Sequence, residues 1–205
     1  MTAPAATPAP APTPPERVPL DALAARVWQE LTRAPHDRHH DWRTPVLATQ
    51  GLDGLPQART VVLRAADSAA RTLTVFTDAR SPKCAELQAQ PAAQLVFWSP
   101  RLGWQLRVPV RAVVFTEGAP VAEAWARVGA SRAAADYLAP LPPGSPWPGR
   151  GEAAADAGPG AGPDASHHLA VLRLQAGAID WLELHRDGHR RARLDPDGAL
   201  HPLVP

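Results

Sequence analysis

The stretch "PVLATQGLDGLPQARTVVLRAA", residues 45–66, decides the fold. Two runs suited to β-structure, "PVLATQG" and "PQARTVVLRAA", are separated by "LDGL". An Asp-Gly pair between two such runs is a strong signal for a tight turn between antiparallel strands. We therefore predict a β-hairpin with strands over residues 45–51 and 56–66.

More strand-like segments follow this hairpin. Three of them are rich in Val, Leu, Phe, Thr and Trp, which favour strands, and they cover residues 72–77, 93–100 and 103–118. Two further strands are predicted over residues 168–185 and 190–196, ahead of the closing "ALHPLVP".

Helical segments are few. Residues 20–31 carry apolar side chains at i, i+3, i+4 spacing, which predicts an amphipathic helix. A short helix is predicted over 82–90 and a further one over about 120–138. Short strands joined by tight turns favour a mainly β fold, an antiparallel barrel flanked by helices. The connections are too short for a doubly wound parallel sheet.

Proline divides the chain of 205 residues into a core and two appendages. Its 25 copies are concentrated in two places. Residues 1–19 form an Ala/Pro-rich tract with little to bury, predicted to be a disordered tail. Residues 140–168 are rich in Pro, Gly and Ala and are predicted to be a mobile insertion. The remainder, residues 20–205, suits a single domain.

Charge and composition exclude several classes of protein. The formal net charge is +1, which supports no global attraction to nucleic acid or an anionic membrane. A single cysteine excludes an internal disulfide. No apolar run approaches the roughly 18 residues of a membrane span, and the N-terminus lacks the order of a signal peptide. A cytoplasmic protein without nucleic-acid or membrane partners is expected.

The stretch "TDARSPKCAEL", residues 77–87, combines a helix start with a cation. Ser81 is a favoured N-cap residue and Pro82 suits the first helical position, so the helix is predicted to start at Ser81. The N-terminus of a helix attracts anions, and Lys83 in the first turn suits an anion in front of it, with Thr77 as a further donor. The alternative is that these charges form an ordinary solvated surface.

Other clusters carry weaker signals. "HDRHHDW", residues 36–42, offers three histidines and two aspartates, but no second ligand cluster matches it, so no metal site is predicted. Arg59 and Arg64 in "RTVVLR" point to opposite faces of a regular strand and serve one anion only if the strand bends or bulges.

Several motifs in a fixed order carry a resemblance. "RTVVLR", "VFTDARSPK", "AQPAAQLVFW", "WQLRVPVRA" and "HRRARL" together resemble the pyridoxamine 5'-phosphate oxidase-like family of FMN-binding split-barrel proteins. The resemblance runs from about Pro45 to the C-terminus, without the insertion. It implies a six-stranded antiparallel split barrel and a homodimer that binds two FMN molecules between its subunits.

The resemblance also implies site residues. Arg59 and Lys83 would contact the FMN phosphate, with Ser81 and Thr77 nearby, and Gln105 would reach FMN from the partner subunit. Arg80 and Cys84 then become surface and packing residues. The complete set implied for cofactor binding is Arg59, Thr60, Val61, Val62, Leu63, Arg64, Phe76, Thr77, Ser81, Lys83, Gln105 and Arg193.

The C-terminal motif departs from that of the vitamin oxidases. Where these carry Arg-Leu-His-Asp-Arg, this chain has His-Arg-Arg-Ala-Arg at 189–193, so only the last arginine is kept. The pattern is more similar to the uncharacterised FMN-binding branch than to the vitamin oxidase itself. Candidate substrate-binding residues are Arg64, Arg132, His189 and Arg191.

The predicted function is therefore an FMN-dependent oxidoreductase that moves a hydride between flavin and a small organic substrate or NAD(P)H. No catalytic acid or base is assigned. Two alternatives remain open. One is a non-catalytic flavin carrier or sensor, and the other is a haem-binding split-barrel protein that uses His167, His168 or His189.

Overall fold

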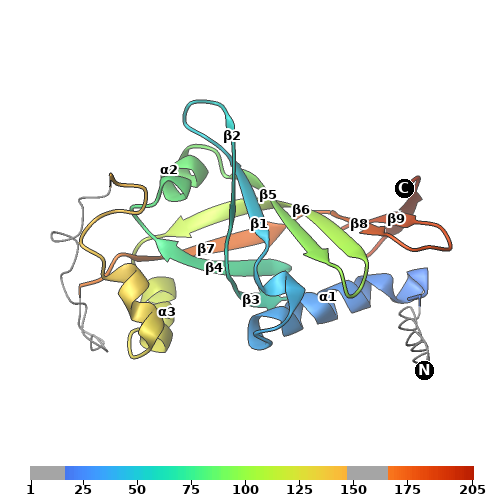
Figure 1. Ribbon diagram of the computed structural model, residues 1–205, viewed down its shortest axis with the longest axis horizontal. Coiled ribbons are helices and arrows are strands. Elements are labelled where there is room, and N and C mark those ends of the chain that lie inside the picture. Colours follow the sequence, from blue (N-terminus) through green and yellow to red (C-terminus); the bar gives the residue numbers. More distant parts are fainter. Residues whose placement is uncertain (1–16, 147–165) are drawn as a thin grey trace, which may run out of the picture.

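The protein is an open antiparallel β-sheet with helices packed against it (Figure 1). The computed structural model describes residues 17–146 and 166–205. Within these residues ten strands join in one hydrogen-bonded sheet, rather than the six expected. The mainly β, antiparallel architecture with flanking helices is confirmed. Most of the predicted N-terminal tail and of the predicted insertion lies outside the described residues.

The strands follow one another along most of the described chain. They are β1 (Val46–Gln50), β2 (Pro56–Thr60), β3 (Leu63–Asp67), β4 (Thr72–Asp78), β5 (Ala92–Ser99), β6 (Trp104–Phe115), β7 (Leu169–Ala176), β8 (Ile179–Glu183), β9 (Arg190–Leu194) and β10 (Leu200–Leu203). The helices are α1 (Leu23–Arg33), α2 (Pro82–Ala89) and α3 (Ala119–Val128), with 3-10 turns η1 (Leu20–Ala22), η2 (Ala34–His36), η3 (Asp41–Arg43) and η4 (Arg132–Tyr137).

The predicted hairpin is present, but its second strand is broken. β1 and β2 pair antiparallel, from Val46 opposite Thr60 to Gln50 opposite Pro56. After Thr60 the chain leaves β1, and β3 pairs with β4 instead. The prediction of one strand over 56–66 was wrong because the chain turns here to bury Leu63 opposite Val75 on β4. The pairing register between β3 and β4 shifts between Leu63 and Ala65. The chain is therefore irregular between Arg59 and Arg64, as the sequence analysis required if both arginines were to serve one anion.

The long strand β6 holds the two parts of the sheet together. Its first half pairs with β8 and its second half with β7, while β5 runs along its other edge. The predicted strand over 168–185 is accordingly split at residues 177–178, because its two halves pair with different ends of β6. β2 and β3 are not paired with each other, so the sheet does not close into a barrel.

The predicted helix over 120–138 is also split, into α3 and η4. Gly129 follows the last residue of α3, and a Cβ there would lie 3.0 Å from the Trp125 carbonyl oxygen. This close approach favours glycine, the residue that most weakens a helix apart from proline. α3 and η4 bury Val121, Trp125 and Tyr137 in a small core of their own against β7.

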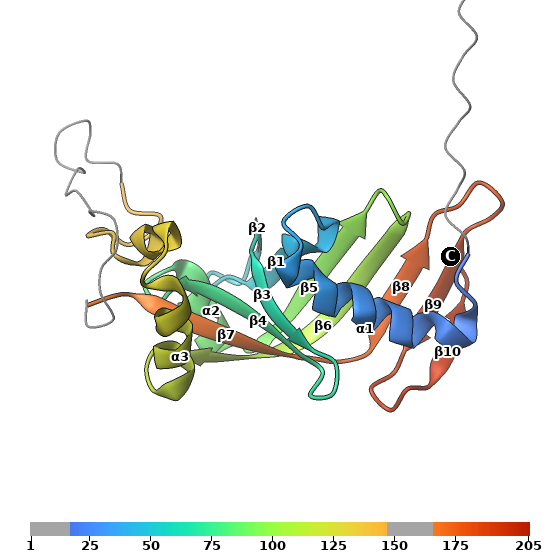
Figure 2. The same cartoon turned by 90° about the horizontal axis from the view of Figure 1, so that it is seen from below.

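The main core lies between α1 and the sheet. Leu23, Val27 and Leu31 of α1 are completely buried, at the helical spacing seen in the sequence. They join Leu47 of β1 and Leu106 of β6 in one cluster. Figure 2 shows α1 lying along the sheet, with α3 at the opposite end of the molecule. In the part of the chain that the structure covers, no helix is long and apolar enough to cross a membrane.

A substitution at Leu106 tests how much this core contributes to stability. Its side chain is completely buried, and replacement by alanine is expected to lower the free energy of unfolding by about 2 to 5 kcal/mol, because a cavity remains. Leu52, which is 71% exposed in the β1–β2 turn, is the matched control, and Leu52→Ala is expected to change the free energy of unfolding by no more than about 0.5 kcal/mol. Urea unfolding measures both, and equal losses would contradict this description of the core.

Candidate functional site

Four polar residues converge where β4 meets α2. Ser81 is the N-cap residue of α2 and Pro82 its first residue, as the sequence predicted. The Ser81 side chain does not cap the helix. Its hydroxyl donates instead to the Asp78 carbonyl at 2.7 Å and lies 3.2 Å from the Thr77 hydroxyl. Lys83 donates from Nζ to the Thr77 Oγ1 at 3.0 Å, which places its ammonium group beside the two hydroxyls.

Arg59 joins this group from β2. Its guanidinium donates to the Thr49 hydroxyl and, at 2.9 Å, to the carboxylate of Glu86. Thr49 donates to the same carboxylate oxygen at 2.6 Å. Sequence reasoning missed Thr49 and Glu86. The available signal was the placement of Glu86 three residues after Lys83, on the same side of α2. We call Arg59, Thr77, Ser81 and Lys83 the cationic cluster.

The cationic cluster is partly withdrawn from water. Burial lowers the pKa of Lys83, and the nearby guanidinium of Arg59 lowers it further. Thr77 and Ser81 are buried, and Glu86 is only 5% exposed. Two cations and one carboxylate leave a net charge of +1 in this place. Such an arrangement is suited to an anion, because an anion would relieve the repulsion between the two cations.

Cys84 follows Lys83 in the first turn of α2 and is buried. Burial raises the pKa of its thiol. The cysteine is therefore a packing residue, as expected, rather than an activated nucleophile.

The chain between β2 and β3 passes beside the cationic cluster. Thr60 is exposed and Val62 is partly exposed, whereas the side chains of Val61 and Leu63 are buried. The backbone N–H of Val61 donates to the Pro45 carbonyl at 2.9 Å, outside both neighbouring ladders. The predicted contact between this backbone and a flavin ring stays a prediction.

Arg64 lies at a different place from Arg59. Its guanidinium stacks 5.8 Å from the centre of the Phe76 ring, and together they line a small groove of about 170 Å³ with Arg127 and Arg173. The Arg64 Nε is buried and has no hydrogen-bond partner among the described residues. Burial raises the pKa of the neighbouring Tyr137, and Arg64 opposes part of that rise.

Gln105 and Arg193 lie on the other face of the sheet from Arg59. Arg59 stands opposite the fully buried Leu47, whereas Gln105 stands opposite the half-exposed Trp98. Residues opposite one another on paired strands share a face. Arg193 is opposite Asp180, on the same outer face. One chain therefore does not bring Gln105 and Arg193 to the cationic cluster.

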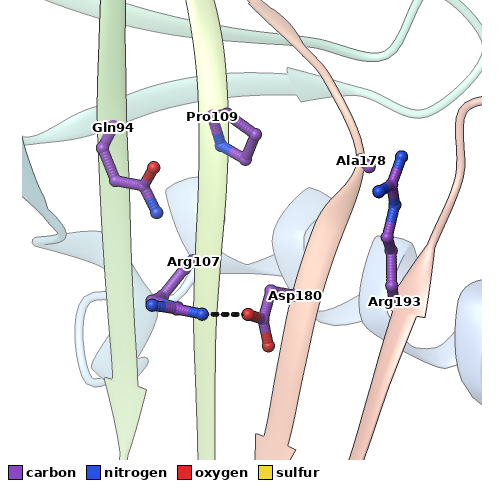
Figure 3. A pocket seen from close by; sticks show the side chains of 6 residues that line it. All are labelled: Gln94, Arg107, Pro109, Ala178, Asp180 and Arg193. Carbon is purple, nitrogen blue, oxygen red and sulfur yellow. Dashed lines mark hydrogen bonds and ion pairs between the residues drawn. The ribbon is translucent and has the colours of Figure 1, made fainter. Parts of the chain in front are cut away.

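The outer face carries a groove of about 510 Å³ (Figure 3). Arg107 on β6 pairs with Asp180 on β8, and Arg193 on β9 stands beside them. Arg191 also pairs with Asp180 at 2.7 Å, and its hydrogen bond is the main reason why the pKa of Asp180 is lowered. The residues that line the groove are Gln94, Arg107, Pro109, Ala178, Asp180 and Arg193.

The candidate substrate residues are spread over the molecule. Arg132 is exposed at the start of η4, next to α3, whereas Arg191 is on β9, at the opposite end (Figure 1). His189 lies just before β9, and its Nδ1 accepts a hydrogen bond from the backbone N–H of His185 at 3.1 Å. Within one chain these residues do not form a site with Arg64, and their roles stay predictions.

The histidines considered for haem or metal have other contacts. The ring of His167 lies 4.1 Å from that of Trp125, and His40 makes a buried 2.7 Å contact with Glu30. In residues 17–146 and 166–205, no group of three or more His, Cys, Asp or Glu side chains is arranged to hold a metal ion.

Comparison with known protein families gives a match over part of the chain. Residues 25–116 match the family model described as pyridoxamine 5'-phosphate oxidase, FMN-binding domain. Over this segment, a little under half of the chain, the sequence is similar to the pyridoxamine 5'-phosphate oxidase-like FMN-binding family. The resemblance inferred from the motifs is confirmed, and FMN is the cofactor that the match supports.

Named relatives match over part of their length. The chain is 43% identical over 83 residues to a pyridoxine/pyridoxamine 5'-phosphate oxidase of Thermosynechococcus vestitus, covering 40% of this chain and 37% of the relative. It is 39% identical over 97 residues to the enzyme of that name from Anaeromyxobacter dehalogenans, covering 47% of each. The chain thus matches less than half the length of these two curated relatives.

Solved structures share the fold over nearly the whole chain. An FMN-binding protein from Nostoc punctiforme related to pyridoxamine 5'-phosphate oxidase aligns with a TM-score of 0.71 at 22% identity, covering 88% of this chain and 96% of that one. PhzG from Burkholderia lata aligns with a TM-score of 0.71 at 19% identity, covering 94% and 99%. These alignments confirm the split-barrel fold class.

The cationic cluster fits the phosphate of FMN. It offers a guanidinium, an ammonium group and two hydroxyls, which are the donors that proteins use for phosphate. Burial lowers the pKa of Lys83, so its charged form is disfavoured at this site and would gain from an anionic partner. Arg59 and Lys83 would hold the phosphate, while Thr77 and Ser81 would orient it.

The pH dependence of FMN binding is expected to report on Lys83. Its pKa is lowered from the ordinary 10.5, mainly by burial, and a bound phosphate favours the charged form. Affinity should therefore be full below that lowered pKa and decline as pH rises through it. Flavin-fluorescence titrations between about pH 7 and pH 10 measure this. Lys83→Arg, which stays charged, should flatten the profile, and an identical decline in both proteins would contradict the assignment.

Proposed function

We propose that the protein is an FMN-dependent oxidoreductase that moves a hydride between bound FMN and a small organic substrate or NAD(P)H. The observation that carries this proposal is the cationic cluster at the start of α2, inside a segment that matches an FMN-binding family. FMN supplies the two-electron chemistry when bound, and the protein has to position it. The specific donor and acceptor are part of the proposal.

The chain's own residues would divide the work of binding. Glu86 and Thr49 hold the Arg59 guanidinium in place, so that it need not be ordered when the phosphate arrives. Lys83 would supply a second, partly desolvated charge. Both cations would act on the phosphate end of the cofactor and leave the reacting ring to other parts of the site.

The surroundings of Arg64 suit the binding of an anionic group of the substrate. Its buried Nε lacks a partner among the described residues, and an unsatisfied buried donor is costly unless a ligand completes it. The groove that it shares with Arg127 and Arg173 has a surplus of positive charge, with Glu123 as the acidic residue in its lining. A substrate with a carboxylate or phosphate would suit this groove.

The visible spectrum of the purified protein tests the proposal first. A flavin absorbance that identifies as FMN is expected, together with bleaching when NAD(P)H or a substrate is added. Flavin that no donor reduces would favour the carrier or sensor alternative. A haem spectrum, or a colourless protein that does not bind added FMN, would refute the proposal.

Single substitutions then test the phosphate contacts. Arg59→Ala and Lys83→Ala are each expected to weaken FMN binding by about 1 to 3 kcal/mol, because each removes a charge-assisted hydrogen bond. Riboflavin, which lacks the phosphate, is the matched ligand control and should bind wild type and both variants alike. Unchanged FMN affinity in both variants would show that the phosphate binds elsewhere.

We also propose that the outer face of the sheet forms a homodimer with FMN at the interface. Gln105 and Arg193 lie on this face, away from the cationic cluster of their own chain, so a second copy would be needed to supply them. The face also exposes apolar side chains, with Val46 38% and Trp98 46% exposed. Exposed apolar groups of this kind are typical of interfaces.

Light scattering after size-exclusion chromatography measures the oligomeric state. The wild type is expected to be a dimer, and Trp98→Asp is expected to shift it toward monomer and weaken FMN binding, because a charge would be buried in the interface. Leu52→Asp is the matched control, since Leu52 is 71% exposed in the β1–β2 turn. A monomeric wild type that binds FMN tightly would refute the dimer.

A further inference from the structure

Arg80 makes more contacts than its predicted role as a surface residue requires. Its side chain is only 22% exposed and forks onto the buried carboxylate of Asp78, with Nε 3.1 Å from Oδ1 and Nη2 2.7 Å from Oδ2. The backbone N–H of Arg80 donates to Oδ1 as well, at 2.8 Å. The pair thus fixes the backbone of the turn between β4 and α2.

The same guanidinium reaches a second part of the chain. Nη2 donates to the Ala139 carbonyl at 2.7 Å and Nη1 to the Pro140 carbonyl at 3.1 Å, just after η4 ends. Nearby, the backbone N–H of Ala79 donates to the His168 carbonyl, and the N–H of His168 donates to the Tyr137 carbonyl. The turn therefore touches the chain both before and after residues 147–165.

This turn also carries the cationic cluster. Thr77 precedes Asp78, and the Asp78 carbonyl accepts hydrogen bonds from both the N–H and the hydroxyl of Ser81. Asp78 therefore holds Arg80 with its side chain and Ser81 with its backbone. A displacement of Arg80 is expected to be felt at Ser81 and, through the first turn of α2, at Lys83.

We propose that Arg80 is a positioning residue that couples the segment 137–141 to the cationic cluster. This proposal rests on the proposed function, because the cluster must bind the FMN phosphate. An anion that orders the turn stabilises the Arg80 contacts, and those contacts in turn order the segment 137–141. Coupling of this kind is reciprocal: the factor by which bound FMN favours the ordered segment 137–141 equals the factor by which the ordered segment raises FMN affinity. Loss of the Arg80 contacts to the segment therefore weakens FMN binding.

Two measurements on the full chain test the coupling. The first is the Kd of FMN, and the second is the hydrogen exchange of peptides that cover residues 134–141, with and without FMN. In the wild type, FMN is expected to slow this exchange. Arg80→Ala is expected to raise the Kd roughly 5- to 20-fold and to abolish the FMN-dependent protection. A purely structural arginine would change exchange in both states and leave the response to FMN intact.

Control variants keep the result interpretable. Arg80→Lys keeps the charge but not the planar fork, so it should raise the Kd less and restore part of the protection. Arg33→Ala removes an arginine that pairs with Asp37 at 3.0 Å on the exposed end of α1, and both readouts should match the wild type. If Arg80→Ala does not fold, Arg80→Lys alone decides, and a lysine variant identical to the wild type in both readouts overturns the proposal.

The two proposals fail in different ways. A wild type that binds no FMN overturns the proposed function. A wild type that binds FMN while Arg80→Ala keeps the same Kd, or keeps the same FMN-dependent protection of residues 134–141, overturns the coupling alone.

Discussion

The ion pair between Arg59 and Glu86 is the contact on which the candidate site depends. Arg59 and Lys83 place two like charges close together where water has limited access. Glu86 offsets part of that repulsion and accepts a hydrogen bond from Thr49 at the same time. Because Glu86 belongs to α2 and Arg59 to β2, the same contact docks the helix against the hairpin and keeps a net positive charge for a ligand.

The sheet explains why such a contact forms at all. β2 leaves β1 after Thr60 and the chain continues into β3, beside β4. β4 then leads directly into the turn that begins α2. The break between β2 and β3 thus brings the end of β2, which carries Arg59, close to the end of β4, where α2 begins. Arg80 adds a third connection, because it ties this turn to the chain after η4.

Much of the fold was predictable from local patterns. The hairpin, the α1 face of Leu23, Val27 and Leu31, and the N-cap at Ser81 all follow from short-range rules of turn chemistry and spacing. The breaks in three predicted elements were not predictable. Whether a run of residues continues or bends depends on which partner strand or core it meets, and a single sequence does not name that partner.

The sequence by itself determined the chemistry available to the site. It placed Arg59 and Lys83 beside strand ends and a helix start, and their companion motifs pointed to FMN, which the family match supports. Only the tertiary structure decided that Glu86 and Thr49 hold Arg59, and that Arg80 holds the segment after η4. These contacts join residues 10 to 60 positions apart, and such pairings are set by the packing of whole elements rather than by local pattern.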